Sequence, residues 1–286
     1  MNIFLSFFLP LSLVFIMFSL GLALRSEDFT RVLRQPLAFA VGLFCQVILL
    51  PIITFGLVLA FGISGEFAIG FMILSACPGG VTSNAISRYA HGDVALSVSL
   101  TAVANLICVL TIPLILGFSF QYFLGTEAGQ ISIFKTALMT FLLTVVPTLI
   151  GLLVRAKFPT SMGKAEPTIA RIAAILFLVV VAAILAISWS VLIENFQKLG
   201  MALFALATVL TVLGLLVSKV AGLEVREAKT IAIETGLQNS TLGITLAALL
   251  VGGTAGFNAF SLPAAVYGVI MLVLMMVFVP LARRFE

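Results

Sequence analysis

Charged residues are scarce in this sequence. Asp, Glu, Lys and Arg make up only 9% of the 286 residues, against roughly 25% in soluble domains, whereas 62% of the residues are apolar. This composition excludes a soluble globular fold. Fifteen basic residues outnumber eleven acidic ones, for a net charge of +4. Because this surplus is not gathered on a water-facing surface, nucleic acid is not an expected partner.

Metal-binding and redox-active residues are also few. The single histidine, His91, excludes a site built from several imidazoles. The three cysteines, Cys45, Cys77 and Cys108, all lie in apolar stretches, and their number and spacing fit neither a disulfide framework nor a metal site. We interpret all three as packing residues.

Long apolar stretches dominate the chain instead. A helix needs about 20 mostly apolar residues to cross the hydrocarbon core of a bilayer. Nine stretches meet this requirement, with approximate limits 3–24, 36–61, 67–87, 94–118, 133–154, 172–193, 199–217, 230–251 and 261–281. The first has no basic residue before its apolar run and no cleavage pattern after it, so we expect a retained helix rather than a signal peptide. The predicted fold is an all-α polytopic membrane protein with nine transmembrane helices.

The basic residues predict the orientation of these helices. With the N-terminus outside, thirteen of the fifteen Lys and Arg residues fall in inner segments, and only Lys135 and Lys198 fall outside. Such an excess is typical of cytoplasmic segments. We therefore expect the C-terminus in the cytoplasm and the protein in a bacterial inner membrane.

Two of the nine spans are interrupted. Residues 77–84 read Cys-Pro-Gly-Gly-Val-Thr-Ser-Asn, where proline removes a backbone donor and two glycines weaken the helix; a simple kink or packing site is the alternative. Residues 234–241 read Glu-Thr-Gly-Leu-Gln-Asn-Ser-Thr, a polar run in an apolar stretch. Non-helical backbone at membrane depth must be buried in protein or line a cavity. Because the two spans cross in opposite directions, they indicate the inverted repeats of a secondary transporter.

Oxygen-bearing side chains gather in and near these segments. Glu234 is the only acidic residue inside a span, which makes it a functional candidate, although regular-helix counting from Lys229 leaves an interfacial position open. Gln46 is the one strong amide in its apolar run, and Gln238 follows Glu234 by one turn. Further side-chain oxygens come from Ser83, Asn84, Ser97 and Thr101. Sodium prefers such ligands, while the N-termini of the half-helices favour an anion, so the chemistry predicts binding of a cation together with an organic anion.

Four motifs cover most of the chain. They are Cys-Pro-Gly-Gly-x-x-Ser-Asn at 77–84, Gly-Asp-Val-Ala-Leu-Ser at 92–97 with Thr101, Gln46 ahead of Pro51, and Glu-x-Gly-x-Gln-Asn at 234–239. Together they closely resemble the bile acid:sodium symporter family, within a larger group that includes arsenite and auxin carriers. The resemblance implies a core domain with helices within 36–118 and 199–281, and a panel domain with helices within 3–24 and 133–193. The chain begins where the family's second helix would, so the nine-helix form is expected.

The resemblance also implies two sodium ions as co-transported ligands. One site matches Ser83, Asn84, Ser97, Thr101 and Glu234. The other matches Gln46, Glu234 and Gln238, with backbone at Thr235 and Leu237. We expect a small organic anion to bind beside the crossing point of the two broken helices, near Thr82, Asn84 and Asn239, where helix dipoles and amides favour negative charge.

The last span differs from that of some relatives. Where they carry a polar Trp-His-Asn stretch, this chain has Ile270, Met271 and Leu272. We therefore predict an apolar wall, with Met271 in the substrate site, and a compact aliphatic monocarboxylate as substrate rather than a di- or tricarboxylate. The family name is no evidence that bile acids are carried.

Two other functions remain open on the sequence alone. A proton-driven or extruding carrier of the arsenite type would use Cys77, but the full set of sodium-type oxygens argues against it. An intramembrane enzyme using Ser83 or Glu234 would lack a second acid, a histidine or a metal cluster. We expect a transporter and not an enzyme, surrounded by lipid and without an obligatory protein partner.

Overall fold

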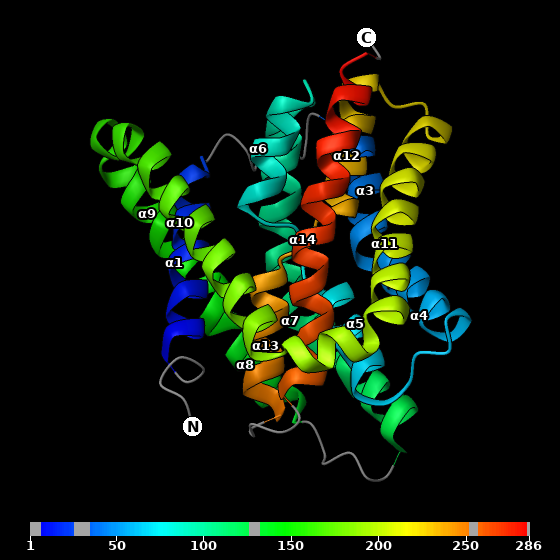
Figure 1. Ribbon diagram of the computed structural model, residues 1–286. Coiled ribbons are helices and arrows are strands. Elements are labelled where there is room, and N and C mark those ends of the chain that lie inside the picture. The colour runs from blue at the N-terminus through cyan, green and yellow to red at the C-terminus, as the bar shows by residue number, and fades with distance from the viewer. Residues whose placement is uncertain (1–6, 26–34, 126–131, 252–256, 285–286) are drawn as a thin grey trace.

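The computed structural model describes residues 7–25, 35–125, 132–251 and 257–284, and most of the chain in these ranges is helical, with no strand in them (Figure 1). Among these residues, six helices are long and apolar enough to cross a membrane. They run over Pro36–Ala60, Val94–Leu124, Phe134–Lys157, Pro159–Ile187, Trp189–Val220 and Ala259–Ala282. The all-helical membrane fold expected from composition is therefore confirmed.

The long helices differ in regularity. Four of them are single elements: α7 (Val94–Leu124), α10 (Pro159–Ile187), α11 (Trp189–Val220) and α14 (Phe257–Ala282). Two contain a π-helical turn and are divided by it into α3 (Pro36–Phe44), η2 (Cys45–Leu49) and α4 (Leu50–Ala60), and into α8 (Ile133–Thr140), η4 (Phe141–Val145) and α9 (Val146–Lys157). The shorter helices are α1 (Leu9–Ala23), α5 (Gly65–Ala76), α6 (Val81–Tyr89), α12 (Val225–Gly236) and α13 (Ser240–Val251).

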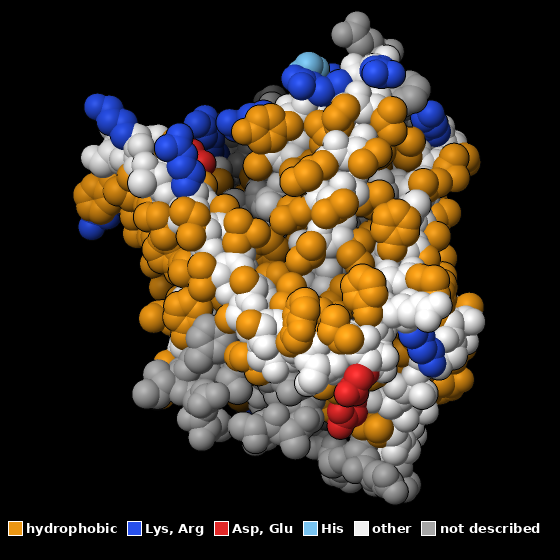
Figure 2. All heavy atoms as spheres, viewed as in Figure 1, with side chains coloured by type: hydrophobic (Ala, Val, Ile, Leu, Met, Phe, Trp, Pro, Cys, Tyr) orange, Lys and Arg blue, Asp and Glu red, His pale blue; other side chains and the backbone are white. Residues whose placement is uncertain are grey.

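The outer surface is that of a protein in lipid. Large apolar side chains such as Leu110, Phe134 and Met276 are 67%, 77% and 74% exposed. In Figure 2 hydrophobic side chains cover the middle of the visible face, and Lys and Arg gather toward the end at which the C-terminus lies. Exposed apolar surface of this extent is unfavourable in water and favourable against acyl chains.

The helices α5 and α6 are separated by a buried break at residues 77–80. Cys77 and Gly80 both have extended backbone. Pro78 has no backbone N–H, so the helix ends where proline and two glycines follow one another. A second break, at residues 237–239, separates α12 from α13, and Leu237 is extended there.

The two breaks lie against each other. The backbone N–H of Asn239 donates to the carbonyl oxygen of Pro78 at 2.8 Å. In Figure 1, α6 and α12 lie toward the end where the C-terminus lies, and α5 and α13 lie toward the opposite end. Backbone groups freed from one helix are thus partly satisfied by the other, which is how irregular backbone is tolerated at membrane depth.

Small residues allow close packing between two pairs of helices. A Cβ added to Gly21 in α1 would collide with the carbonyl oxygen of Thr148 in α9, and one added to Gly151 would collide with that of Phe18. Similarly, a Cβ on Gly236 would collide with Thr211 Oγ1 in α11. Such small-residue contacts let membrane helices approach backbone to backbone. They hold α1 against α9, and α12 against α11.

One helix boundary differs from the sequence prediction. The turn between the sixth and seventh spans was expected near residues 194–198, but α10 ends at Ile187 and α11 begins at Trp189. Glu194 and Lys198 lie on the first turns of α11, where Lys198 Nζ donates to the carbonyl oxygen of Gly62 at 2.6 Å. These two charged residues therefore lie within a helix and not in the turn between the two helices.

Candidate functional site

A fully buried carboxylate lies at the meeting point of the two breaks. Glu234 is 0% exposed, two residues before the end of α12. Protein therefore encloses this carboxylate and shields it from water. A buried carboxylate is costly unless donors surround it. Glu234 accepts hydrogen bonds from Ser97 Oγ, from Thr101 Oγ1 at 2.9 Å and from Gln46 Nε2 at 3.3 Å.

Ser97 and Thr101 reach this carboxylate because of how α7 begins. Asp93 caps the helix, its Oδ1 accepting from the backbone N–H groups of Ala95 and Leu96 at 3.0 Å each. Such a cap fixes where the helix begins and which face it presents. Ser97 and Thr101 follow by one and two turns and so lie on one face. The carbonyl oxygen of Asp93 also accepts from Thr230 Oγ1 at 3.2 Å, which joins the start of α7 to α12.

Gln46 reaches the carboxylate through the π-helical turn η2. A π-turn adds a residue to the helix and locally rotates its side chains, and such turns are frequent at functional sites. Gln46 Nε2 donates to both the backbone oxygen and the side chain of Glu234, at 3.1 and 3.3 Å. The amide therefore belongs to the site and is not a packing residue.

Gly79 lies in the middle of this group. An added Cβ would be 2.5 Å from Glu234 Oε2 and 3.4 Å from both Gln46 Nε2 and Ser83 Oγ. Only glycine leaves the space that these three side chains share. The first glycine of the Pro-Gly-Gly run thus has a steric role in addition to ending the helix.

Oxygens exceed protons around Ser97. Its Oγ lies near Glu234 Oε1 and 2.8 Å from Asn84 Oδ1, but a hydroxyl has a single hydrogen to donate. Asn84 points its oxygen into this cluster while its buried Nδ2 has no partner. An arrangement rich in acceptors and poor in donors is one that a cation would stabilise.

Two further buried acceptors lie on η2 and at the break between α12 and α13. The side-chain oxygens of Gln46 and Gln238 are both buried without a hydrogen-bond partner. Gln238 Nε2 donates to the carbonyl oxygen of Thr235 at 2.9 Å, and Leu237 is extended. A buried amide oxygen without a donor is costly unless an ion or a water molecule binds it.

The ligand chemistry is that of a hard cation. Over the part of the chain that the structure describes, no three His, Cys, Asp or Glu side chains gather as a transition-metal site requires. Hydroxyl, amide, carbonyl and a single carboxylate suit a cation of low charge.

A cavity of about 320 Å³ opens beside the crossing point, between α10 and the broken helices. Its polar lining includes Thr82, Gln238 and Asn239, and its apolar wall includes Ile16 and Phe177. Figure 2 shows the molecule hollowed in this region, near the end rich in Lys and Arg. The volume lies at the lower end of the roughly 300–1,000 Å³ range of small-molecule sites.

The N-termini of the two half-helices differ in how they are capped. Asn239 Oδ1 accepts from the backbone N–H of Leu242 at 3.0 Å, so α13 is capped by its own chain. Gly80 precedes α6 and offers no side-chain cap. The N-terminus of α6, next to Gly80 and Thr82 in the cavity wall, is therefore the end with free donors.

Two residues of the expected substrate site lie elsewhere. Met271 is 1% exposed in the hydrophobic core and does not line the cavity, because its face of α14 packs against other helices. Asn84 is 8% exposed and its oxygen faces Ser97, so it belongs to the carboxylate group.

Arg171 is a cavity residue that sequence reasoning missed. It is exposed, and it lines the cavity from α10 together with Pro167, Ala174 and Phe177. In the sequence it counted only as one of the basic residues of an inner segment. Spacings of three and four residues from Pro167 to Phe177 were the signal that these side chains share a face.

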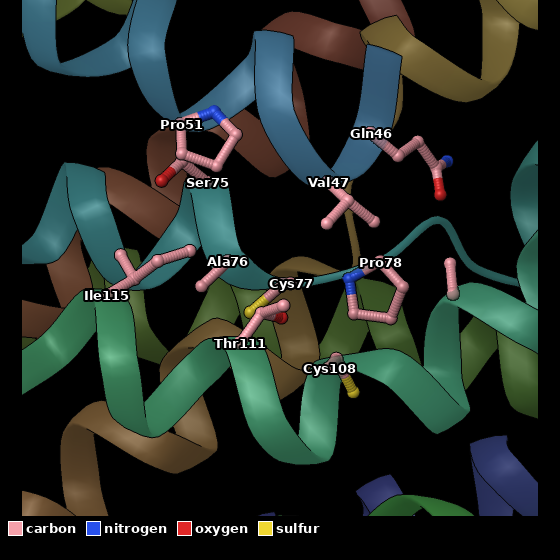
Figure 3. A pocket seen from close by; sticks show the side chains of 11 residues that line it. Gln46, Val47, Pro51, Ser75, Ala76, Cys77, Pro78, Cys108, Thr111 and Ile115 are labelled. Carbon is pink, nitrogen blue, oxygen red and sulfur yellow. The ribbon is translucent and has the colours of Figure 1, made fainter. Parts of the chain in front are cut away.

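The cysteines lie away from this cavity. Cys77 Sγ donates to the carbonyl oxygen of Ile73 at 3.2 Å. Figure 3 shows Cys77 and Cys108 with Gln46 and Pro78 around a separate cavity of about 10 Å³, room for one water at most. This position fits the packing role expected for Cys77 and Cys108. The larger cavity has no cysteine in its lining, so it does not fit a thiol site for arsenite.

The sequence matches the profile of the Sodium Bile acid symporter family over residues 10–195. The chain belongs to the sodium bile acid symporter family. A sodium-dependent transporter of Bacillus subtilis, YocS, is 30% identical over 269 residues, which cover 92% of this chain and 79% of that protein. The human ileal sodium/bile acid cotransporter is 31% identical over 254 residues, 87% of this chain and 71% of the relative. A probable sodium/metabolite cotransporter of rice chloroplasts, BASS2, is 30% identical over 233 residues, 82% of this chain and 54% of the relative.

Family membership confirms the resemblance that the motifs indicated. As a member of a family of symporters with long apolar helices, the chain is an integral membrane protein of sodium-coupled transport rather than an enzyme.

Proposed function

We propose that the protein is a sodium-coupled symporter of a small organic anion that works by alternating access. The observation that carries the proposal is the buried Glu234 carboxylate, surrounded by more oxygens than protons and adjacent to an amide-lined cavity. A cation would bind the excess oxygens around Glu234, and an anion would bind in the amide-lined cavity. Binding both at one crossing point is what symport requires.

Two sodium ions would bind on either side of Glu234. The first would take oxygens of Ser83, Asn84, Ser97, Thr101 and Glu234. The second would take Gln46, Glu234 and Gln238, with backbone oxygens at Thr235 and Leu237. The unpartnered Oε1 atoms of Gln46 and Gln238 support this second site. Two sodium ions with a monovalent anion carry net positive charge, so uptake would rise with an inside-negative potential, by about 2.3 kcal/mol per net charge per 100 mV.

The anion would bind in the 320 Å³ cavity. Its carboxylate would lie near the uncapped N-terminus of α6, with Thr82 and Asn239 donating, and its body would lie against Ile16 and Phe177. Arg171 would attract it at the edge of the cavity. The small volume and apolar wall favour a compact aliphatic monocarboxylate over a di- or tricarboxylate.

Coupling would follow from electrostatics. With sodium absent, the Glu234 carboxylate places negative charge beside the cavity, which repels an anion. Bound sodium reverses the sign of this charge, so each ligand raises the affinity for the other by the same factor.

The same helices suggest the transport architecture. We infer nine spans, in which α5–α6 and α12–α13 are the corresponding members of inverted triplets, and in which α1 and α8–α10 form a panel beside this core. With the basic end in the cytoplasm, the cavity beside Arg171 opens inward. Reporters fused after Lys164 and Arg226 are expected in the cytoplasm and one near Gly65 outside; a cytoplasmic reporter at Gly65 would contradict this orientation.

Uptake by purified protein in proteoliposomes tests the proposal. A panel of monocarboxylates, sulfonates and dicarboxylates is offered under an inward sodium gradient, an inward proton gradient, or neither. We expect uptake of a monocarboxylate only with sodium, increased by an inside-negative potential. Uptake driven by protons without sodium would refute the proposal and favour the proton-driven alternative.

A further inference from the structure

A second basic cleft lies outside the transport site, where α1, α9 and α10 meet. Its volume is about 450 Å³, and it is lined by Leu24, Arg25, Leu152, Arg155, Ala156, Pro159 and Thr160. Two of these seven residues are arginines, and none of them is acidic. The cleft lies where α1 and α9 end and where α10 begins.

Arg155 is the residue that most requires a ligand here. Its side chain is partly buried, and its Nη1 atom is shielded from solvent without any hydrogen-bond partner. The guanidinium packs near Gly163 of α10, where an added Cβ would lie 3.2 Å from Nη1. An unpaired buried donor of a charged group is costly, and a planar guanidinium binds phosphate oxygens with two parallel hydrogen bonds.

The start of α10 adds donors to the same cleft. The residue before the helix, Phe158, provides no side-chain cap, and Pro159 and Thr160 of the first turn line the cleft. The free N–H groups and the dipole of this 29-residue helix favour an anion. Leu24, which is 1% exposed, and Leu152 form the apolar inner side of the cleft and pack with Val98 of α7, whereas the neighbouring Leu153 of α9 is 66% exposed.

We propose that this cleft binds a phosphate group, and that its source is the headgroup of an anionic phospholipid. Basic pockets between membrane helices on the cytoplasmic side recognise such headgroups. The cleft lies at the end of the molecule rich in Lys and Arg (Figure 2), and a lipid would place its acyl chains along the exposed Leu149 and Leu153 of α9. The bound lipid would join α1 to the hairpin of α9 and α10.

Thermal melting of the purified protein in detergent tests this proposal. Phosphatidylglycerol, phosphatidylcholine and inorganic phosphate are titrated separately, at about 0.5 M salt, where exposed charges are screened within a few ångströms. The variants are Arg155→Gln, Arg155→Lys and a matched control, Lys157→Gln, which removes a charge from the same helix end outside the cleft. Sodium-dependent stabilisation in each variant verifies that the protein is folded.

We expect phosphatidylglycerol to raise the melting temperature of the wild type more than phosphatidylcholine does. The lipid concentration at half effect should rise at least about tenfold in Arg155→Gln and also rise in Arg155→Lys, which keeps the charge but loses the planar fork, and change less than about twofold in Lys157→Gln. Equal lipid response in all variants, or equal loss in Arg155→Gln and Lys157→Gln, would overturn the proposal. Stabilisation by inorganic phosphate that equals that by lipid and needs Arg155 would overturn the lipid source and leave a free phosphate site.

Discussion

Replacing Glu234 by glutamine tests the cation site most directly. The substitution keeps the shape and removes the charge. Its amide oxygen can still accept from Thr101 and Gln46, and its NH2 group can donate to Ser97 Oγ. Without sodium, the wild type buries a carboxylate that has no counterion, which costs desolvation free energy. Glutamine removes this cost, so the sodium-free variant is expected to fold with unchanged or slightly higher stability. The expected loss is confined to sodium binding.

The size of this loss follows from the position of the carboxylate. For unit charges about 4 Å apart at an effective dielectric constant of about 20, the attraction is about 4 kcal/mol. At about 1.4 kcal/mol for each factor of ten, sodium affinity should fall about a thousandfold. Sodium at a hundred times its dissociation constant stabilises the wild type by about 2.7 kcal/mol. In a chain of this size, that corresponds to a melting temperature about 5 to 10 °C higher.

Melting curves in sodium and in potassium at equal ionic strength measure this difference. We expect a shift of that size in the wild type and none in Glu234→Gln. Glu194→Gln makes the same chemical change at an exposed position on α11 and should retain the wild-type shift. A sodium-dependent shift that survives in Glu234→Gln would refute the idea that one carboxylate serves both cations.

Three further substitutions separate the parts of the site. Gly79→Ala should abolish the sodium-dependent melting shift although it removes no ligand, because its Cβ would lie 2.5 Å from Glu234 Oε2. The control is Gly56→Ala, whose Cβ meets nothing within 4 Å, and equal melting shifts in the two variants would contradict the steric argument. Asn239→Ser keeps a cap for α13 but loses a hydrogen bond to the substrate, so substrate affinity measured by calorimetry in sodium should fall about tenfold. The sodium-dependent melting shift should be unchanged, and loss of this shift together with substrate binding would count against a substrate role. Arg171→Gln should weaken substrate affinity about threefold, and only from the cytoplasmic side, since an exposed charge contributes little. Transport in vesicles of both orientations measures this affinity on each side, with Lys164→Gln as control. Equal weakening from both sides would exclude a role at the inward-facing cavity.

Sequence alone determined the class of the protein and the places where its helices break. Long apolar runs can be satisfied only in a membrane, and Pro78 with the glycines that follow it cannot continue a helix, whatever surrounds them. The combination of four motifs indicated the family, which the comparison confirms. These conclusions depend on local chemistry and on spacing along the chain, so no tertiary information was required.

Tertiary structure decided which oxygens face one another and what else surrounds them. A membrane helix that is apolar on all sides carries no periodic signal for its inward face, so the placement of Met271 in the packed core, rather than in the cavity, followed from packing alone. The contact between Glu234 and Ser97 joins residues 137 positions apart. Arg171 was visible in the sequence only as a charge at a membrane edge. Its position at the cavity depends on how α10 packs beside the broken helices, which is a property of the whole fold.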